Sequence, residues 1–274
     1  MTLIADKSEA SSNKALLSDK LYWHGYIPFY ESFFASRDIK NIAEFGVYKG
    51  NSIRWLLERF PEAQIHGADI LPLQSNWPAS ERFKFTQLDQ SSIGQIQEFL
   101  RQKTFDLIIE DGSHLVKHQI NCIIAGLENL SSNGIYILED IQTARRDHAW
   151  WEKPKLHWWK FGEKRKARAL LKDQDFGKGN ALHLLLALDH YQRIGVQIDA
   201  QVANSLAKNS LFTESQIVDL ASKIKSIHLY QRNHLPDMCH RCGAITFDYV
   251  ALKCACGEKI FSDADSMSFV IIRN

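Results

Sequence analysis

Between residues 41 and 144, short apolar runs alternate with segments that have helical spacing. The run NIAEFGV is followed by NSIRWLLERF, whose apolar residues fall on one helical face, and then by the strand-like AQIHGADI. The alternation continues through FKFTQLD, SSIGQIQEFLRQ, FDLIIEDGS, HQINCIIAGLENL and IYILEDI. Five apolar strands joined by helices predict an α/β, doubly wound, Rossmann-like fold with a mostly parallel sheet covered on both faces.

Acidic residues gather where the predicted strands end. These ends read EFGVYKG, ADI, LDQ, EDGSH and EDIQTA. In open α/β sheets, ligands bind beyond the carboxyl ends of the strands. A mere scaffold does not require acids there, so the pattern predicts a binding or catalytic crevice along this edge of the sheet.

The turn after the first strand carries Glu44, Gly46 and Gly50 in the pattern E-x-G-x-x-x-G. Glycines at such a turn permit a tight bend and a close approach of the backbone to a ligand. The turn lacks the extra glycine of the dinucleotide fingerprint G-x-G-x-x-G, which disfavours a pyrophosphate and favours a nucleoside without phosphates. An ordinary connecting turn explains this motif equally well when it is taken alone.

Two further candidate cofactor ligands follow the next strands. Asp69 closes the second strand, at the place from which a carboxylate reaches a ribose hydroxyl pair. Asp89 and Gln90 follow the third strand. Each is also compatible with a solvated loop, but in this order, after the glycine turn, they predict a nucleoside pocket.

The fourth and fifth strands end in residues suited to a metal and to proton transfer. Asp111 and Asp140 are our candidates for binding Mg²⁺, which prefers carboxylate oxygens and water, and Glu139 is a candidate third ligand. His114 would take a proton from a substrate hydroxyl, because a histidine pKa lies near working pH. The alternative for His114 is a residue at a helix N-terminus that merely hydrogen-bonds a carboxylate.

These motifs together resemble class I S-adenosylmethionine-dependent methyltransferases. The resemblance implies that Gly46 and Gly50 meet the methionine part of the cofactor and that Asp69 holds its ribose. The stretches FDLIIEDGSHLVKHQ and SSNGIYILEDIQTA resemble the metal-dependent sugar O-methyltransferases of macrolide biosynthesis and the related cephalosporin hydroxylase-like group.

The second resemblance covers about residues 20 to 144, including LYWHGYIPFYESFF ahead of the first strand. It implies that Asp111, His114 and Asp140 belong to the active site. The chain departs from this family at Glu110, where a second aspartate is often found. The departure concerns the predicted metal ligands more than the predicted cofactor-binding residues.

The remaining segments suggest the domain organisation. Residues 1–20 are polar and Ser-rich and predict a flexible arm, whereas LYWHGYIPFYESFF predicts a capping helix. We expect the methyltransferase domain to span residues 21–236 and 263–274, with a basic, Trp-rich lid or insert over 145–180. That insert would suit an acidic or phosphorylated substrate, or would be a lid with core tryptophans and a solvated basic face.

Four of the five cysteines lie close together near the C-terminus. The pairs Cys239/Cys242 and Cys254/Cys256 are each followed by a glycine and bracket ITFDYVAL, which reads as a hairpin strand. Four thiolates predict a structural zinc knuckle over residues 237–262, with free or redox-active thiols as the alternative. The flanking segments IKSIHLYQRN and MSFVIIRN resemble the final two antiparallel strands of the methyltransferase fold. The resemblance implies that the knuckle is an insertion in their hairpin, and such an insertion suits substrate delivery or contact within a homo-oligomer.

Composition limits the possible functions. The net charge of +1 gives no overall attraction to nucleic acid or membrane, and we find no signal peptide or spanning segment, so a cytoplasmic protein is expected. The favoured function is O-methylation of a small hydroxylated acceptor, such as a sugar, with S-adenosylmethionine and Mg²⁺ as cofactors and zinc as a structural metal. RNA methylation is the alternative, suggested by the Trp-rich segment and the knuckle. A non-catalytic scaffold is the third.

Overall fold

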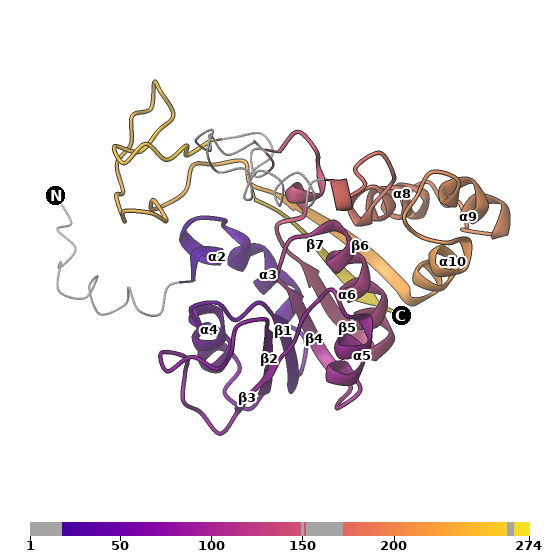
Figure 1. The fold of residues 1–274 in the computed structure, drawn as a ribbon, viewed down its shortest axis with the longest axis horizontal. Coiled ribbons are helices and arrows are strands. Elements are labelled where there is room, and N and C mark those ends of the chain that lie inside the picture. Colours follow the sequence, from indigo (N-terminus) through magenta and orange to yellow (C-terminus); the bar gives the residue numbers. More distant parts are fainter. Residues whose placement is uncertain (1–17, 149–150, 152–171, 262–265) are drawn as a thin grey trace.

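The computed structural model describes residues 18–148, 151, 172–261 and 266–274. These ranges form a seven-stranded sheet in the order β3-β2-β1-β4-β5-β7-β6 (Figure 1). The five strands predicted from the apolar runs are parallel, and each pairs with its neighbours in the order β3-β2-β1-β4-β5. They are β1 (Asn41–Phe45), β2 (Gln64–Asp69), β3 (Phe83–Gln87), β4 (Phe105–Glu110) and β5 (Leu130–Leu138).

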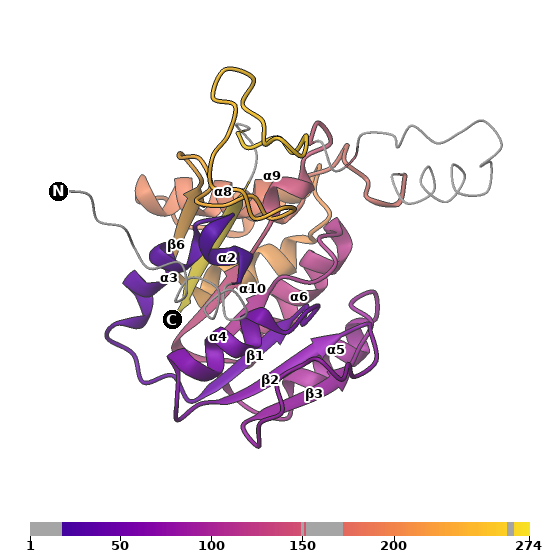
Figure 2. The same ribbon diagram turned by 90° about the vertical axis from the view of Figure 1, so that its left-hand side faces the viewer.

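Side chains alternate along the strands between two apolar layers, as expected for a sheet that is buried on both faces. On β4, Leu107 and Ile109 face one layer, whereas Ile108 faces the other. The first layer includes α3 (Tyr26–Phe34) and α4 (Asn51–Arg59). The second includes α5 (Ile93–Leu100), α6 (Val116–Asn129), α8 (Ala181–Arg193), α9 (Ala200–Ala207) and α10 (Glu214–Lys223), as Figure 2 illustrates. The doubly wound prediction is confirmed.

The last two strands form the predicted antiparallel hairpin. β7 (Met267–Arg273) lies between β5 and β6 (Ile224–Gln231) and is antiparallel to both. The cysteine segment lies between these two strands in the sequence and therefore is an insertion in the hairpin. Within residues 232–261 the structure has isolated bridges instead of the strand predicted from ITFDYVAL, because Asp248 accepts hydrogen bonds from the amides of Val250 and Ala251 and turns the chain there.

The N-terminal segment differs from the prediction in two ways. The single capping helix is divided into α2 (Asp19–Tyr22) and α3, with Gly25 at a positive φ of 71° between them. The proposed arm over residues 1–20 also extends too far, because Lys20 lies in α2 with only 2% of its surface exposed. A charged side chain is buried only where it has partners, and those partners lie in the candidate site.

The segment after β5 is described only in part. Trp150, Trp158 and Trp159 of the predicted insert lie outside the described residues. Trp151 is buried, and its indole Nε1 donates to the carbonyl of Thr143 at 2.6 Å. This tryptophan therefore offers no open face for stacking a base or a sugar. Among the described residues, no helix combines the length and apolar character needed to cross a bilayer.

Candidate functional site

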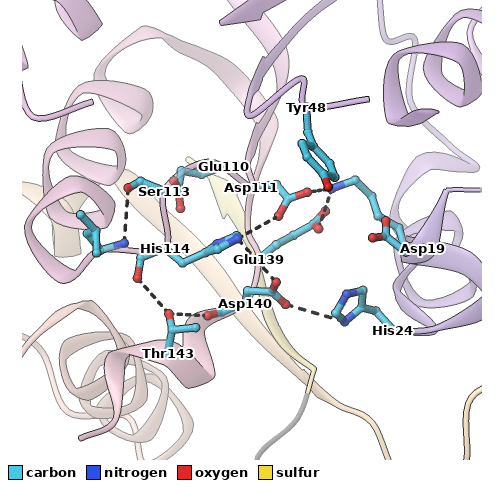
Figure 3. A network of polar contacts seen from close by, with 12 residues as sticks. Asp19, His24, Tyr48, Glu110, Asp111, Ser113, His114, Glu139, Asp140 and Thr143 are labelled. Atoms are coloured by element: carbon cyan, nitrogen blue, oxygen red, sulfur yellow. Dashed lines mark hydrogen bonds and ion pairs between the residues drawn. The ribbon is translucent and has the colours of Figure 1, made fainter. Parts of the chain in front are cut away.

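Asp111, His114 and Asp140 meet at the carboxyl ends of β4 and β5. One donor atom from each lies within 4.8 Å of the others. The Nε2 atom of His114 is 4.0 Å from Oδ1 of Asp111 and 3.8 Å from Oδ2 of Asp140 (Figure 3). The adjacency of β4 and β5 in the sheet produces this convergence, as the sequence predicted.

The backbone at two of these residues has an unusual conformation. His114 has φ 56° and Asp140 has φ 50°, in the left-handed region that side chains other than glycine rarely adopt. The hydroxyl of Thr143 lies 3.0 Å from the carbonyl oxygen of His114 and 2.8 Å from that of Asp140, and so it joins the two turns. Such backbone strain is concentrated at functional sites, where surrounding contacts hold it in place.

Gly46 is required by the close approach of the β1 and β4 loops. A Cβ atom at Gly46 would lie 2.0 Å from the carbonyl oxygen of Asp111, and the residue has φ 93°. The glycine turn and the acidic turn are therefore in direct contact. The predicted cofactor end and the predicted catalytic end form one continuous site.

Lys20 lies among the carboxylates, and sequence reasoning missed it. Its Nζ atom donates to Oδ2 of Asp111 at 2.5 Å and to Oε2 of Glu139 at 2.6 Å, and lies 3.7 Å from Oε1 of Glu44. Burial lowers the pKa of Lys20, but these carboxylates outweigh burial and raise the pKa well above its usual value. The side chain is therefore a buried ammonium ion.

Asp140 is held by residues from the N-terminal segment, which were not among the predicted site residues. Its Oδ1 atom accepts hydrogen bonds from the Tyr26 hydroxyl at 2.8 Å and from Gln142 at 3.0 Å, and lies 3.7 Å from Nδ1 of His24. Burial opposes ionisation of Asp140. Nearby His24 and His114, with these hydrogen bonds, nevertheless hold its pKa below the usual range. Asp140 is therefore ionised, and its Oδ2 faces His114.

The other acids in the cluster are harder to ionise. Burial raises the pKa of Glu44 to about 7, although Lys20 opposes the rise, and burial also raises that of Glu110 to about 7. Burial raises the pKa values of Asp111 and Glu139 as well, against the attraction of Lys20. A further cation bound among these acids would favour their ionised forms and lower their pKa values.

The oxygen atoms left in this cluster fit a hard divalent cation. Oδ2 of Asp111 accepts a hydrogen bond from Lys20, and Oδ1 of Asp140 accepts hydrogen bonds from Tyr26 and Gln142. Oδ1 of Asp111 and Oδ2 of Asp140 both face His114. Glu139, the candidate third ligand, is not part of the group whose donor atoms converge, although its buried Oε1 has no hydrogen-bond partner. Mg²⁺ is typically bound by one or two carboxylates, with water and substrate oxygens as its other ligands, so these two aspartates suit it.

Asp69 is placed beside the glycine turn. Its Oδ2 accepts from the backbone amides of Val47 and Tyr48, each at 2.9 Å, and its Oδ1 accepts from the amide of Leu71 at 2.9 Å. Asp69 therefore orders the turn that was predicted to meet the cofactor. Gly50 ends the same turn with φ 74° and is followed by α4.

Asp89 and Gln90 have different surroundings. Asp89 caps its own turn by accepting from the amide of Ser91 at 2.8 Å. Gln90 is buried, and its side chain donates to Glu110 at 2.8 Å and accepts from the amide of Ser113 at 2.8 Å. Gln90 therefore supports the turn that carries His114, and its side-chain hydrogen bonds are already committed to the protein.

Comparisons with known proteins agree with this geometry. Residues 43–141 match a family described as a methyltransferase domain. The predicted resemblance to S-adenosylmethionine-dependent methyltransferases and to the sugar O-methyltransferases is confirmed. Mycinamicin VI 2''-O-methyltransferase of Micromonospora griseorubida is 31% identical over 135 residues, which is 45% of this chain and 33% of that protein. A rhamnosyl-tetracenomycin-C 3'-O-methyltransferase of Streptomyces olivaceus is 28% identical over 132 residues, covering 44% of this chain and 33% of that protein.

The chain thus spans about a third of the length of these curated relatives. A solved structure with the same fold is the MycE methyltransferase of mycinamycin biosynthesis in complex with Mg and SAH, with a TM-score of 0.55 and 21% identity. The match covers 98% of this chain and 55% of that one. The methyltransferase fold therefore extends beyond residues 43–141 and includes the N-terminal segment and the last two strands.

Proposed function

We propose that this protein transfers the methyl group of S-adenosylmethionine to a hydroxyl of a sugar or of another small biosynthetic metabolite, assisted by Mg²⁺. The observation that carries the proposal is the convergence of Asp111, His114 and Asp140 beside Gly46. The sugar O-methyltransferases among the relatives support the choice of acceptor class.

In this proposal the β1 and β2 ends bind the cofactor. The loop that contains Gly46 and Gly50 would meet the methionine part, and Asp69, which already orders the loop, would hold the ribose. Carboxylate oxygens can accept several hydrogen bonds each, so the backbone amides on Asp69 leave capacity for a ribose hydroxyl. Glu44 lies at the other side of the loop, buried against Ser52 and Lys20.

The β4 and β5 ends would bind the acceptor. Mg²⁺ at Asp111 and Asp140 would orient the acceptor hydroxyl and lower its pKa. The hydroxyl oxygen would attack the methyl carbon of the bound cofactor, and the bond from that carbon to sulfur would break. The proton of the hydroxyl passes to His114, whose Nε2 lies between the two aspartates. The products are the methyl ether and S-adenosylhomocysteine.

Lys20 would set the charge of this site. It neutralises part of the carboxylate charge and holds Oδ2 of Asp111, so that Oδ1 stays directed toward His114. A fixed ammonium at this position would compensate Asp111 and Glu139 when no divalent cation is bound, and would limit the remaining negative charge to what one divalent cation can balance.

Calorimetry of cofactor binding and an assay of S-adenosylhomocysteine formation test the proposal. We expect S-adenosylmethionine to bind the wild-type protein, and S-adenosylhomocysteine to form when Mg²⁺ and a panel of glycosylated or free sugar acceptors are added. Asp140→Asn should retain cofactor binding and lose the stimulation by Mg²⁺. A protein that does not bind S-adenosylmethionine, or an Asp140→Asn variant with full stimulation, would contradict the assignment.

A further inference from the structure

The four clustered cysteines form a compact group between β6 and β7. One sulfur atom from each of Cys239, Cys242, Cys254 and Cys256 lies within 4.8 Å of the others. The Sγ atoms of Cys242 and Cys254 are 3.3 Å apart, and those of Cys239 and Cys256 are 3.7 Å apart. Four thiolates bonded tetrahedrally to zinc at about 2.3 Å have sulfur atoms about 3.8 Å apart, so the group is already close to the size that zinc requires.

The two cysteine turns share one backbone pattern. Gly243 donates its amide to the carbonyl of Cys239 at 2.9 Å, and Gly257 donates to the carbonyl of Cys254 at 2.8 Å. Both glycines have positive φ, 73° and 89°. The amide of the first cysteine in each pair also bonds to a carbonyl beyond the glycine, that of Ala244 or Glu258, at 2.8 Å. Two like turns that point four thiols at one another form a built metal site.

The cysteine group packs directly on the N-terminal segment. Trp23 shares a small buried cluster with Cys239, Cys254 and Ile260. Its ring lies edge-on to His240 at a centroid distance of 4.2 Å. The amide of Asp237 donates to the carbonyl of Tyr22 at 2.9 Å.

Arg232 links the same parts of the molecule. It donates to the carbonyl of Trp23 at 2.7 Å and to that of Ile260 at 3.3 Å, and its guanidinium lies 5.3 Å from the centre of the Trp23 ring. Both ribbon views show the loops of this insertion beside α2 (Figures 1 and 2). The insertion therefore covers the N-terminal segment rather than standing apart from the domain.

That segment supplies the site residues that the sequence did not reveal. Lys20 precedes Trp23 and reaches Asp111 and Glu139, whereas His24 and Tyr26 follow it and face Asp140. α2 is only four residues long, so it has little stability of its own. Its position depends on what packs against Trp23, and two of the four buried members of that cluster are cysteines.

We propose that the four cysteines bind a zinc ion, and that the zinc-bound insertion fastens residues 19–26 in the position that brings Lys20, His24 and Tyr26 to the acidic site. The zinc is structural, because its four positions are all taken by protein sulfur. The insertion thus acts as a positioning element for the catalytic crevice, through Trp23. Zinc content and hydrogen exchange are measured without methyl transfer. This proposal can therefore fail while the proposed function stands, and the proposed function can fail while this proposal stands.

Metal analysis and hydrogen exchange of the full chain test the proposal. We expect about one zinc per chain, lost from Cys242→Ser, which changes the exposed ligand and disturbs packing least. Cys122→Ser is the matched control, because Cys122 is buried in α6, away from the four clustered cysteines, and the serine hydroxyl can still accept from Gln90. This control should keep the zinc.

The amides of Trp23 and His24 both donate to the carbonyl of Asp19 and report on the position of α2. Their hydrogen exchange should become roughly tenfold faster or more when a strong chelator removes the zinc from the wild-type protein. The exchange should slow again when zinc is restored. Amides of β4 should not change. Trp23→Ala should keep its zinc but show the same faster exchange. Two disulfides or four free thiols in the isolated protein would overturn the metal site, and unchanged exchange after zinc removal would overturn the coupling.

Discussion

Replacement of Lys20 by methionine tests whether this ammonium ion is the counter-charge of the site. The side chain is 2% exposed and pairs with Asp111 and Glu139, which are 24% and 1% exposed. Removing one partner of a buried ion pair costs about 3–5 kcal/mol, because it leaves the other charge uncompensated. Asp111 keeps some contact with solvent, so we expect about 3 kcal/mol for Lys20→Met in the absence of divalent cations.

Urea unfolding at pH 7 measures this cost. With a slope of about 3 kcal/mol per molar urea, the midpoint should fall by about 1 M in the presence of EDTA. The same substitution at Lys40, whose exposed ammonium pairs with Asp38, is the matched control and should leave the urea midpoint nearly unchanged.

Adding Mg²⁺ in place of EDTA should then reduce the difference in urea midpoint between Lys20→Met and the wild-type protein. A divalent cation binds the folded state at the freed carboxylates and stabilises it by linkage, and the variant offers it more free oxygen atoms. A midpoint loss no larger than that of Lys40→Met, or equal stabilisation of both proteins by Mg²⁺, would refute the reasoning.

Three other substitutions probe separate parts of the structure. His114→Gln should lower turnover by about 10²–10⁴-fold while the dissociation constant for S-adenosylmethionine stays unchanged in calorimetry; normal turnover would remove His114 from proton transfer. Gly46→Ala should destabilise the fold by more than about 2 kcal/mol and weaken cofactor binding, because its Cβ would meet the Asp111 carbonyl at 2.0 Å. Burial, with Lys84 and Lys103, lowers the pKa of His66 in the folded state. The unfolded state therefore binds more protons at His66 below about pH 6.5, so this histidine contributes a fall in stability from pH 7 to pH 5, opposite in sign to the contribution of Glu44 and Glu110. His66→Phe should reduce that fall, and equal pH slopes in urea unfolding would contradict the buried-histidine account.

The fold could be predicted because each strand carries its own local signal. Leu107, Ile108 and Ile109 are apolar in succession, which is typical of a strand buried on both faces, and the structure places alternate members in opposite layers. Asp111 and Asp140 could be predicted to meet because neighbouring parallel strands bring their carboxyl ends to one edge. Both arguments need only local sequence and one topological rule.

Lys20 could not be predicted in the same way. It lies in a polar, Ser-rich stretch with no apolar period, and lysine is usually exposed, so its burial follows only from contacts with residues far along the chain. A signal was present in the sequence, since His24 and Tyr26 are polar groups within an otherwise apolar aromatic run. The left-handed conformation of His114 and Asp140 had no such signal, because it is imposed by Thr143 and by the turns around them.

The site is completed by segments outside the methyltransferase domain match at residues 43–141. Tyr26 lies before that match, and its hydroxyl contacts both Asp140 and the carbonyl of Met267, which lies after it. His24 likewise contacts Ser266, with its Nδ1 2.8 Å from the serine hydroxyl. Residues 24–26 and residues 266–267 therefore meet beside Asp140, at the carboxyl end of β5. The strand ends supply the carboxylates of the site, whereas residues 20–26 supply Lys20, His24 and Tyr26. Changes at His24 or Tyr26 would therefore alter the surroundings of Asp140 without touching the hydrogen bonds by which Asp69 holds the turn at Val47 and Tyr48. If the proposed function holds, this division would let a constant cofactor-binding core be combined with different acceptor-binding segments.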